Sequence, residues 1–322
     1  MHLYKYVSNP NFILNDGYIR ATQLSALNDP FEATYSKKAL KKLTKEFNCE
    51  LDDKELLKYI EENKHKVCVI SFTEAKDDLL MWAHYANEHK GALIGFSFYT
   101  GYTVFFKKLF RFTETALDKP FDYYDGKCHA IIYRKQQMYK IDMFDRDYSN
   151  ISVEGEDRLL FEIFLQKSDE WIYEKEHRII LKLSQADKVI LDDFDKYKDI
   201  KFIDNMLNND ISENPKIEFE SCKKENGDKC TKLHIFLEDI ESEEDRSVWG
   251  NSLANLAKNN PEILYLFKID SSSICSLTYG IKSSKEIRNN EYLYPKQTGY
   301  FERYNTRLNK KNYTLKFQKI EE

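Results

Sequence analysis

The stretch W-I-Y-E-K-E-H-R-I-I-L, Trp171 to Leu181, places titratable side chains directly before an apolar run. Read as a strand, it alternates side chains between two faces, so Glu174, Glu176 and Arg178 share one face. Two carboxylates on one face repel, which raises the pKa of one of them unless a cation such as Arg178 intervenes. The stretch therefore predicts either a site that holds an acid and a base, or a surface strand whose charges pair with neighbouring strands.

Composition predicts a globular chain with an aromatic core. Hydrophobic residues make up 42% of the 322 residues, with 22 Tyr and 21 Phe but only 10 Gly and 6 Pro. This length allows one large elaborated domain or two smaller ones. The formal net charge of -5 gives no general attraction to nucleic acid or to an anionic membrane, although a local basic groove is still allowed.

The N-terminal sequence and the length of the apolar runs predict a soluble, cytoplasmic protein. The start M-H-L-Y-K-Y lacks the pattern of a signal peptide, and no apolar run approaches the roughly 18 residues of a membrane span. The six cysteines are therefore expected to be reduced thiols. Cys222, Cys230 and His234 are spaced more widely than the ligands of most zinc sites, so we expect no metal there.

Periodicity predicts an α+β fold with a central, mostly antiparallel sheet flanked by helices. We expect strands near residues 3, 18, 68, 93, 130, 178 and 275, and a further strand at 104–112. Two amphipathic helices are expected within 37–66, and another helix at 155–167. We expect a single domain over residues 1–322, with an insertion at 195–260.

Two further segments carry candidate binding residues. Because Pro30 keeps the residue before it out of the helical region, Asn28 and Asp29 are expected in a turn that, with Glu32, forms a pocket rim or only a tight connection. The predicted helix from Leu79 to Ala86 carries the other candidates, Trp82, His84 and Tyr85. His84 is either a hydrogen-bonded core residue or a pocket residue.

Four blocks stand out along the chain: L-Y-K-Y at 3–6, L-N-D-P-F-E at 27–32, the segment from S-F-T through L-L-M-W-A-H-Y-A to H-K-G at 71–91, and W-I-Y-E-K-E-H-R-I-I at 171–180. Together they resemble a bacterial family known as the domain-of-unknown-function 2971 family. The late I-x-x-L-T-Y-G that ends at Gly280 also fits. His177 departs from the pattern, since members tend to carry an aromatic residue there. The resemblance implies candidate site positions, including Tyr4, Lys5 and Ser71, and no mechanism.

A second resemblance is to ADP-ribosyltransferases, which cleave NAD and transfer ADP-ribose. It depends on the order of a short first strand, a Ser-containing strand with Ser71, and the Glu174-Lys-Glu176 motif. It implies NAD as co-substrate, a protein or nucleic acid as target, and a role in phage defence or as a toxin. Of the first-strand Arg or His of those enzymes, only His2 is a possible counterpart.

The residue roles implied by this resemblance follow from the chemistry of NAD. Cleavage of the nicotinamide–ribose bond builds an oxocarbenium-like cation, which a carboxylate stabilises. Glu176 would stabilise this cation and hold a ribose hydroxyl, and Glu174 would orient or deprotonate the acceptor. Tyr4, Trp82 or Tyr85 would stack on nicotinamide. This hypothesis requires a cleft that joins Glu176 to Tyr4, Ser71 and Tyr85.

Two alternatives from other functional classes stay open. A nuclease would gather a divalent metal with its carboxylates and place Lys175 nearby; those carboxylates would be Asp29, Glu32, Glu174 and Glu176. A non-enzymatic sensor or binding module would use the same pocket for a small-molecule ligand without turnover. The oligomeric state does not follow from the sequence.

Overall fold

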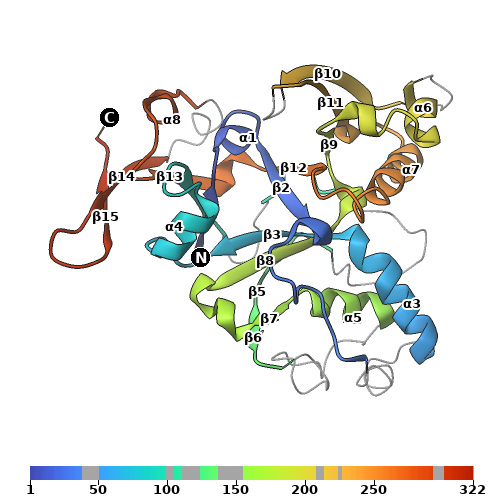
Figure 1. Ribbon diagram of the computed structural model, residues 1–322, viewed down its shortest axis with the longest axis horizontal. Helices are drawn as coiled ribbons and strands as arrows, with labels where there is room; N and C mark the ends of the chain where they lie inside the picture. Colours follow the sequence, from blue (N-terminus) through green and yellow to red (C-terminus); the bar gives the residue numbers. More distant parts are fainter. Residues whose placement is uncertain are drawn as a thin grey trace.

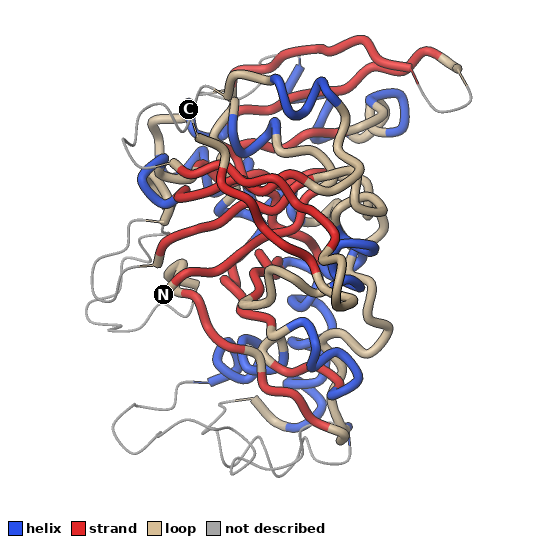
Figure 2. The backbone as a smooth tube through the Cα atoms, turned by 90° about the vertical axis from the view of Figure 1, so that its left-hand side faces the viewer, coloured by secondary structure: helices blue, strands red, loops and turns tan. Residues whose placement is uncertain are grey.

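The computed structural model describes residues 1–37, 51–98, 105–110, 124–136, 155–207, 214–223, 227–292 and 301–321. A large, mostly antiparallel sheet runs through the middle of the molecule, with helices gathered around it (Figures 1 and 2). The predicted α+β class is therefore confirmed. The predicted single domain and its insertion at 195–260 stay predictions.

The centre of the sheet is the antiparallel pair β3 (Val67–Thr73) and β8 (Glu176–Lys182). These strands are in register over their whole lengths, from Val67 opposite Lys182 to Thr73 opposite Glu176. Both faces of β3 are buried: Cys68, Ile70 and Phe72 pack into the main core, and Val67 and Val69 pack into a second core. Burial on both faces explains the nearly continuous apolar run V-C-V-I-S-F.

The other edge of β3 is shared by two strands, so the sheet forks there. β2 (Tyr18–Gln23) pairs with the start of β3, with Thr22 opposite Val69, and β1 (His2–Val7) meets only the end of β3, with Tyr4 opposite Thr73. Neither strand supplies a register partner for β3 between these two points. Because neither β1 nor β2 pairs with the middle of β3, side chains can reach the backbone of β3 at the fork.

Each arm of the fork continues as a row of strands. From β2 the row runs through β12 (Leu264–Lys268), β9 (Lys188–Leu191), β11 (Lys229–Phe236) and β10 (Lys216–Lys223). From β1 it runs through β4 (Ala92–Ser97), β13 (Ile274–Tyr279), β14 (Glu302–Leu308) and β15 (Leu315–Lys319). The pair β13–β14 is parallel.

Three short strands lie on the side of β8 that faces away from β3. β5 (Cys128–Ala130) pairs with β8. β6 (Ile132–Arg134) and β7 (Gln166–Ser168) form a separate parallel ribbon of two strands. The predicted strand near residue 130 is therefore confirmed. At 104–112, residues 105–110 form only an isolated bridge between Phe106 and Ile269, and the other positions lie outside the described residues.

The helices cover both arms of the sheet. They are α1 (Asn11–Leu14), α3 (Asp53–Asn63), α4 (Leu79–Tyr85), α5 (Gly155–Ile163), α6 (Lys201–Leu207), α7 (Glu243–Ala254) and α8 (Lys285–Asn289). A capping box of Asp52 and Glu55 starts α3, which buries Leu56 and Ile60 one turn apart. In Figure 1, α3 and α5 lie together below β3 and β8. The other helix expected within 37–66 falls mainly outside the described residues.

The cysteine prediction is wrong at one pair. Cys222 and Cys230 are directly opposite in the β10–β11 hairpin, with Cα atoms 5.0 Å apart, and they form a disulfide. This distance lies within the range that a disulfide spans. Within the described segments, no helix is both long and apolar enough to cross a membrane.

Candidate functional site

A cavity of about 240 Å³ lies at the fork between β1 and β2. Tyr4 and Lys5 of β1, Arg20 of β2 and Ser71 of β3 form part of its wall. The Ser71 carbonyl has no partner in a described strand on this side and instead accepts a hydrogen bond of 3.0 Å from Lys5 Nζ. The open edge of β3 thus explains both the cavity and the position of a half-buried lysine beside it.

The structure brings most of the predicted site residues to this one cavity. Those that line it are Tyr4, Lys5, Asn28, Asp29, Glu32, Ser71, Tyr85, Glu174, Glu176 and Arg178. They come from five separate segments of the chain, so the predicted blocks meet in space. The cleft that the transferase hypothesis requires, from Glu176 to Tyr4, Ser71 and Tyr85, is present.

Three candidates lie outside the cavity lining. Trp82 is fully buried against Tyr6, and its Nε1 donates a 3.0 Å hydrogen bond to the Lys76 carbonyl. His84 is exposed on the same helix, α4. His2 lies near the Ser97 hydroxyl, with 3.2 Å between its Nδ1 and Oγ. On α4 it is therefore Met81 and Tyr85 that face the cavity.

The predicted strand from Trp171 to Leu181 is wrong in its first half. Asp169–Glu174 forms a 3-10 helix, and Lys175 follows in the left-handed region with φ 44°. The strand begins at Glu176, so Glu176 and Arg178 share a face as predicted, whereas Glu174 reaches the same place from a helical turn. The Ser168 hydroxyl, which accepts a hydrogen bond from Glu170 N, favours this turn over a strand.

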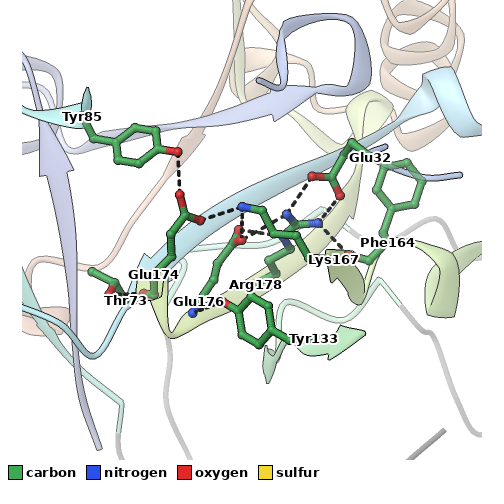
Figure 3. A network of polar contacts seen from close by, with 9 residues as sticks. All are labelled: Glu32, Thr73, Tyr85, Tyr133, Phe164, Lys167, Glu174, Glu176 and Arg178. Carbon is green, nitrogen blue, oxygen red and sulfur yellow. Dashed lines mark hydrogen bonds and ion pairs between the residues drawn. The ribbon is translucent and has the colours of Figure 1, made fainter. Parts of the chain in front are cut away.

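The carboxylates of this region are held in one buried network of ion pairs (Figure 3). Lys167 Nζ lies 2.6 Å from Glu174 Oε2 and 2.9 Å from Glu176 Oε2. Arg178 Nε donates to Glu176 Oε1 at 2.6 Å, and both terminal nitrogens of Arg178 donate to Glu32. Arg178 is 1% exposed, so these pairs are shielded from water.

Neutral groups complete the network. The Tyr85 hydroxyl donates to Glu174 Oε1 at 2.7 Å, and the Glu176 N–H donates to the Tyr133 hydroxyl at 2.8 Å. Arg178 also donates to the Phe164 carbonyl at 2.8 Å. The charged groups therefore have partners on several sides, as buried charges require.

The two cations decide the protonation state of Glu176. Burial alone would raise the pKa of this carboxyl, but Arg178 and Lys167 outweigh burial and lower the pKa to about 2. Glu176 is therefore ionised at neutral pH and cannot serve as a general acid. The pKa of the Tyr85 hydroxyl is raised by burial and by the neighbouring Glu174 charge, so Tyr85 is a proton donor in its hydrogen bond.

The part of the cavity lining that β1 and β2 supply carries positive charge. Burial lowers the pKa of Lys5 to about 8, and the nearby Glu176 charge partly opposes this shift. Arg20 donates a long hydrogen bond of 3.4 Å to the Pro261 carbonyl, and its Nε is buried with no partner in the described part of the chain. Among the described residues, neither Lys5 nor Arg20 has a carboxylate within ion-pair distance.

Asp29 adds one unsatisfied acceptor to the same cavity. Its Oδ1 accepts from the Phe31 N–H at 2.9 Å, which forms the turn expected before Pro30. Its Oδ2 is buried and has no hydrogen-bond partner within the described structure. An orphaned carboxylate oxygen costs free energy, and a ligand that donates a hydrogen bond would remove this cost.

Sequence reasoning missed Lys167 and Arg20. Lys167 was expected at the end of a helix, but α5 stops at Ile163 and Lys167 lies on β7. The only sequence signal for it is indirect, because two nearby carboxylates need a cation when they are buried. Arg20 lies in a strand that was predicted without a role.

The carboxylates are not arranged as metal ligands. In the part of the chain that the structure describes, no group of three or more His, Cys, Asp or Glu residues could hold a metal ion. The nitrogen atoms of Lys167 and Arg178 occupy the positions between Glu32, Glu174 and Glu176. The geometry therefore gives the nuclease alternative no support.

Comparison with known proteins adds a family match over part of the chain. Neither the curated proteins nor the solved structures gave a match. Residues 81–179, which run from Met81 on α4 to Ile179 on β8 and include Glu174, Glu176 and Arg178, match the family described as protein of unknown function (DUF2971).

Proposed function

We propose that the fork cavity binds a nucleotide, with NAD as the first candidate ligand. The observation that carries this proposal is that the carboxylates and the cations without ion pairs in the cavity lining come from different segments of the chain. Around β8, the three carboxylates of Glu32, Glu174 and Glu176 outnumber the two cations of Lys167 and Arg178. On β1 and β2, Lys5 and Arg20 have no carboxylate partner among the described residues.

NAD has the matching separation of charge. Its pyrophosphate is anionic, and its nicotinamide ring carries a positive charge. The pyrophosphate would therefore lie toward Lys5 and Arg20, and the nicotinamide end toward Glu174 and Glu176. A ribose hydroxyl would donate to Asp29 Oδ2, which has no hydrogen-bond partner among the described residues.

The size and lining of the cavity fit one end of such a ligand. A volume of about 240 Å³ corresponds to roughly eight waters at about 30 Å³ each, enough for a ring and its sugar but not for a whole dinucleotide. Tyr4, Phe72, Tyr85 and Trp171 supply aromatic surface for the ring. The adenine half would then lie outside the cavity.

The second candidate function is NAD consumption by transfer of ADP-ribose to a protein or a nucleic acid. It is favoured by the excess negative charge of the carboxylate network and by the ionised state of Glu176, since both would stabilise an oxocarbenium-like cation. Glu174 would orient the acceptor through the oxygen that Tyr85 contacts. A binding module would use the same contacts without breaking a bond.

The first test is calorimetric titration of NAD into the wild type and into Lys5→Met. We expect binding by the wild type, and an affinity about tenfold lower in Lys5→Met, because a charge-assisted contact to phosphate is lost. Lys58→Met is the matched control, since Lys58 lies on α3 with its side chain 76% exposed. Absence of NAD binding by a folded wild type would overturn the proposal.

Release of nicotinamide separates the two candidates. Wild type and Glu174→Gln would be incubated with NAD and cell lysate, and nicotinamide would be quantified. Release by the wild type that falls at least a hundredfold in Glu174→Gln, with NAD binding retained, would support transfer. Binding without release would reject transfer and leave a nucleotide-binding module.

A further inference from the structure

A second cavity, of about 170 Å³, lies beside the β6–β7 ribbon. Lys167 borders both cavities, so the ribbon stands between them. Arg134 and Lys135 line the second cavity together with Gln166, and Phe31 lies at its edge with 64% of its surface exposed. Its described lining contains no carboxylate, which distinguishes it from the fork cavity.

The register of the ribbon explains why it serves two cavities. In the parallel pair β6–β7, Tyr133 is opposite Lys167, and Arg134 is opposite Ser168. Tyr133 and Lys167 both contact Glu176, so this face of the ribbon adjoins the ion-pair network. Because side chains alternate along a strand, Arg134, Gln166 and Ser168 point to the other face.

Two donors on this other face have no acceptor. Arg134 Nε and Gln166 Nε2 are buried and make no hydrogen bond with any described residue. Buried donors without partners are rare because each loses its hydrogen bonds to water on folding. Two such donors at one cavity, with a lysine at its edge, are the arrangement that an oxyanion would satisfy.

We propose that the second cavity is a phosphate-binding site. The Arg134 guanidinium would bind two phosphate oxygens, and the Gln166 amide would donate to one of them. The Lys135 side chain, which is 87% exposed and 3.9 Å from Asp169, would add a cation at the mouth. This site does not depend on the function proposed for the fork cavity.

The phosphate has two chemical sources, a free inorganic ion or the phosphate of a nucleotide. The exposed Phe31 ring at the edge offers a surface on which a base could stack. Inorganic phosphate and adenosine monophosphate therefore serve as the two probes. Phe31→Ala should weaken the nucleotide and leave inorganic phosphate unchanged if a nucleotide is the ligand.

The experiment is calorimetric titration of inorganic phosphate into the wild type, Arg134→Met and Gln166→Leu. We expect a loss of affinity of about tenfold or more in Arg134→Met and a smaller loss in Gln166→Leu. Arg307→Met is the matched control, because Arg307 is exposed on β14 and should not affect binding. Loss of phosphate affinity in the two ribbon variants, but not in Arg307→Met, would place the site at the ribbon.

Several results of these titrations would contradict a phosphate site at the ribbon. The proposal is overturned if the folded wild type binds neither probe, or if Arg134→Met and Gln166→Leu both bind phosphate as the wild type does. It is also overturned if Lys5→Met, and not the ribbon variants, abolishes phosphate binding. Should Arg134→Met fail to fold, Gln166→Leu alone decides between these outcomes.

Discussion

Two buried carboxylate–arginine clusters in this molecule shift the pKa of a carboxyl group in opposite directions. In the fork network, Glu176 contacts both Arg178 and Lys167, and its pKa falls to about 2. In the other arm of the sheet, Asp187 next to β9 meets Arg246 of α7 at 2.8 Å, yet its pKa is raised to about 6. Both carboxylates are nearly inaccessible to water.

The difference lies in the number of cations for each carboxylate. Burial raises the pKa of Asp187, and one arginine with the Lys268 N–H at 2.7 Å does not compensate for it. Arg246 also leaves one hydrogen-bond donor unsatisfied, because its Nε is buried without a partner in the described chain. Two cations therefore outweigh the burial of Glu176, whereas one arginine does not outweigh the burial of Asp187.

The largest expected difference between the two clusters is the loss of stability when the arginine of each is removed. Arg178→Met would leave Glu32 buried without its cation, and we expect a loss of about 3–5 kcal/mol in the free energy of unfolding at pH 7. Arg246→Met should cost less, about 2 kcal/mol, because Asp187 can take up a proton instead. Urea unfolding of both variants would measure the two losses.

Arg307→Met on exposed β14 controls for the loss of an arginine, with an expected change below about 0.5 kcal/mol. At pH 5.5 the deficit of Arg246→Met should shrink, while that of Arg178→Met should persist. Equal losses for the two variants at both pH values would contradict the account based on cation number.

The pH dependence of stability should differ in sign between the two acids. The pKa of Asp187 is about 6 in the folded protein and 3.8 without perturbation, so the folded state binds the proton first and is stabilised as the pH falls. Between pH 7 and pH 4.5 this amounts to about 2 kcal/mol. Glu176 contributes stability above its ordinary pKa of 4.5, which is lost as the pH falls toward 2.

Asp187→Asn isolates the first of these effects. Denaturant unfolding of the wild type and the variant across pH 4.5 to 7 should show a wild-type gain of about 2 kcal/mol at the acidic end that the variant lacks. Other titrating groups are common to both proteins and cancel in the difference. Parallel curves for the two proteins would show that Asp187 has an ordinary pKa.

The same contrast shows how far the sequence could predict the site. Alternation placed Glu176 and Arg178 on one face of β8 correctly, because a strand with buried faces follows a period of two. The turn at Asn28 and Asp29 followed from the restriction that Pro30 imposes. These local rules identified many of the residues that line the cavity.

The rest depended on contacts that no local rule encodes. The left-handed Lys175 breaks the expected strand and gives Glu174 its position. The fork depends on where β1 and β2 end along β3, which is set by pairing between distant segments. Lys167 and Arg20 enter the site only through these features, so their roles could not be predicted from their neighbours in the chain.

The smallest effect concerns the hydroxyl that Tyr85 donates to Glu174. Tyr85→Phe removes a 2.7 Å hydrogen bond to the Glu174 side chain, but Glu174 keeps its ion pair with Lys167, so we expect a loss of only about 1 kcal/mol in urea unfolding. Tyr304→Phe is the matched control, because the Tyr304 hydroxyl donates to the exposed Glu302 at 2.6 Å. There water replaces the lost partner, and the change should be below about 0.5 kcal/mol. If Tyr85→Phe instead cost as much as Arg178→Met, Glu174 would depend on its tyrosine more than on its cation, and cation number could not be the rule that separates the two clusters.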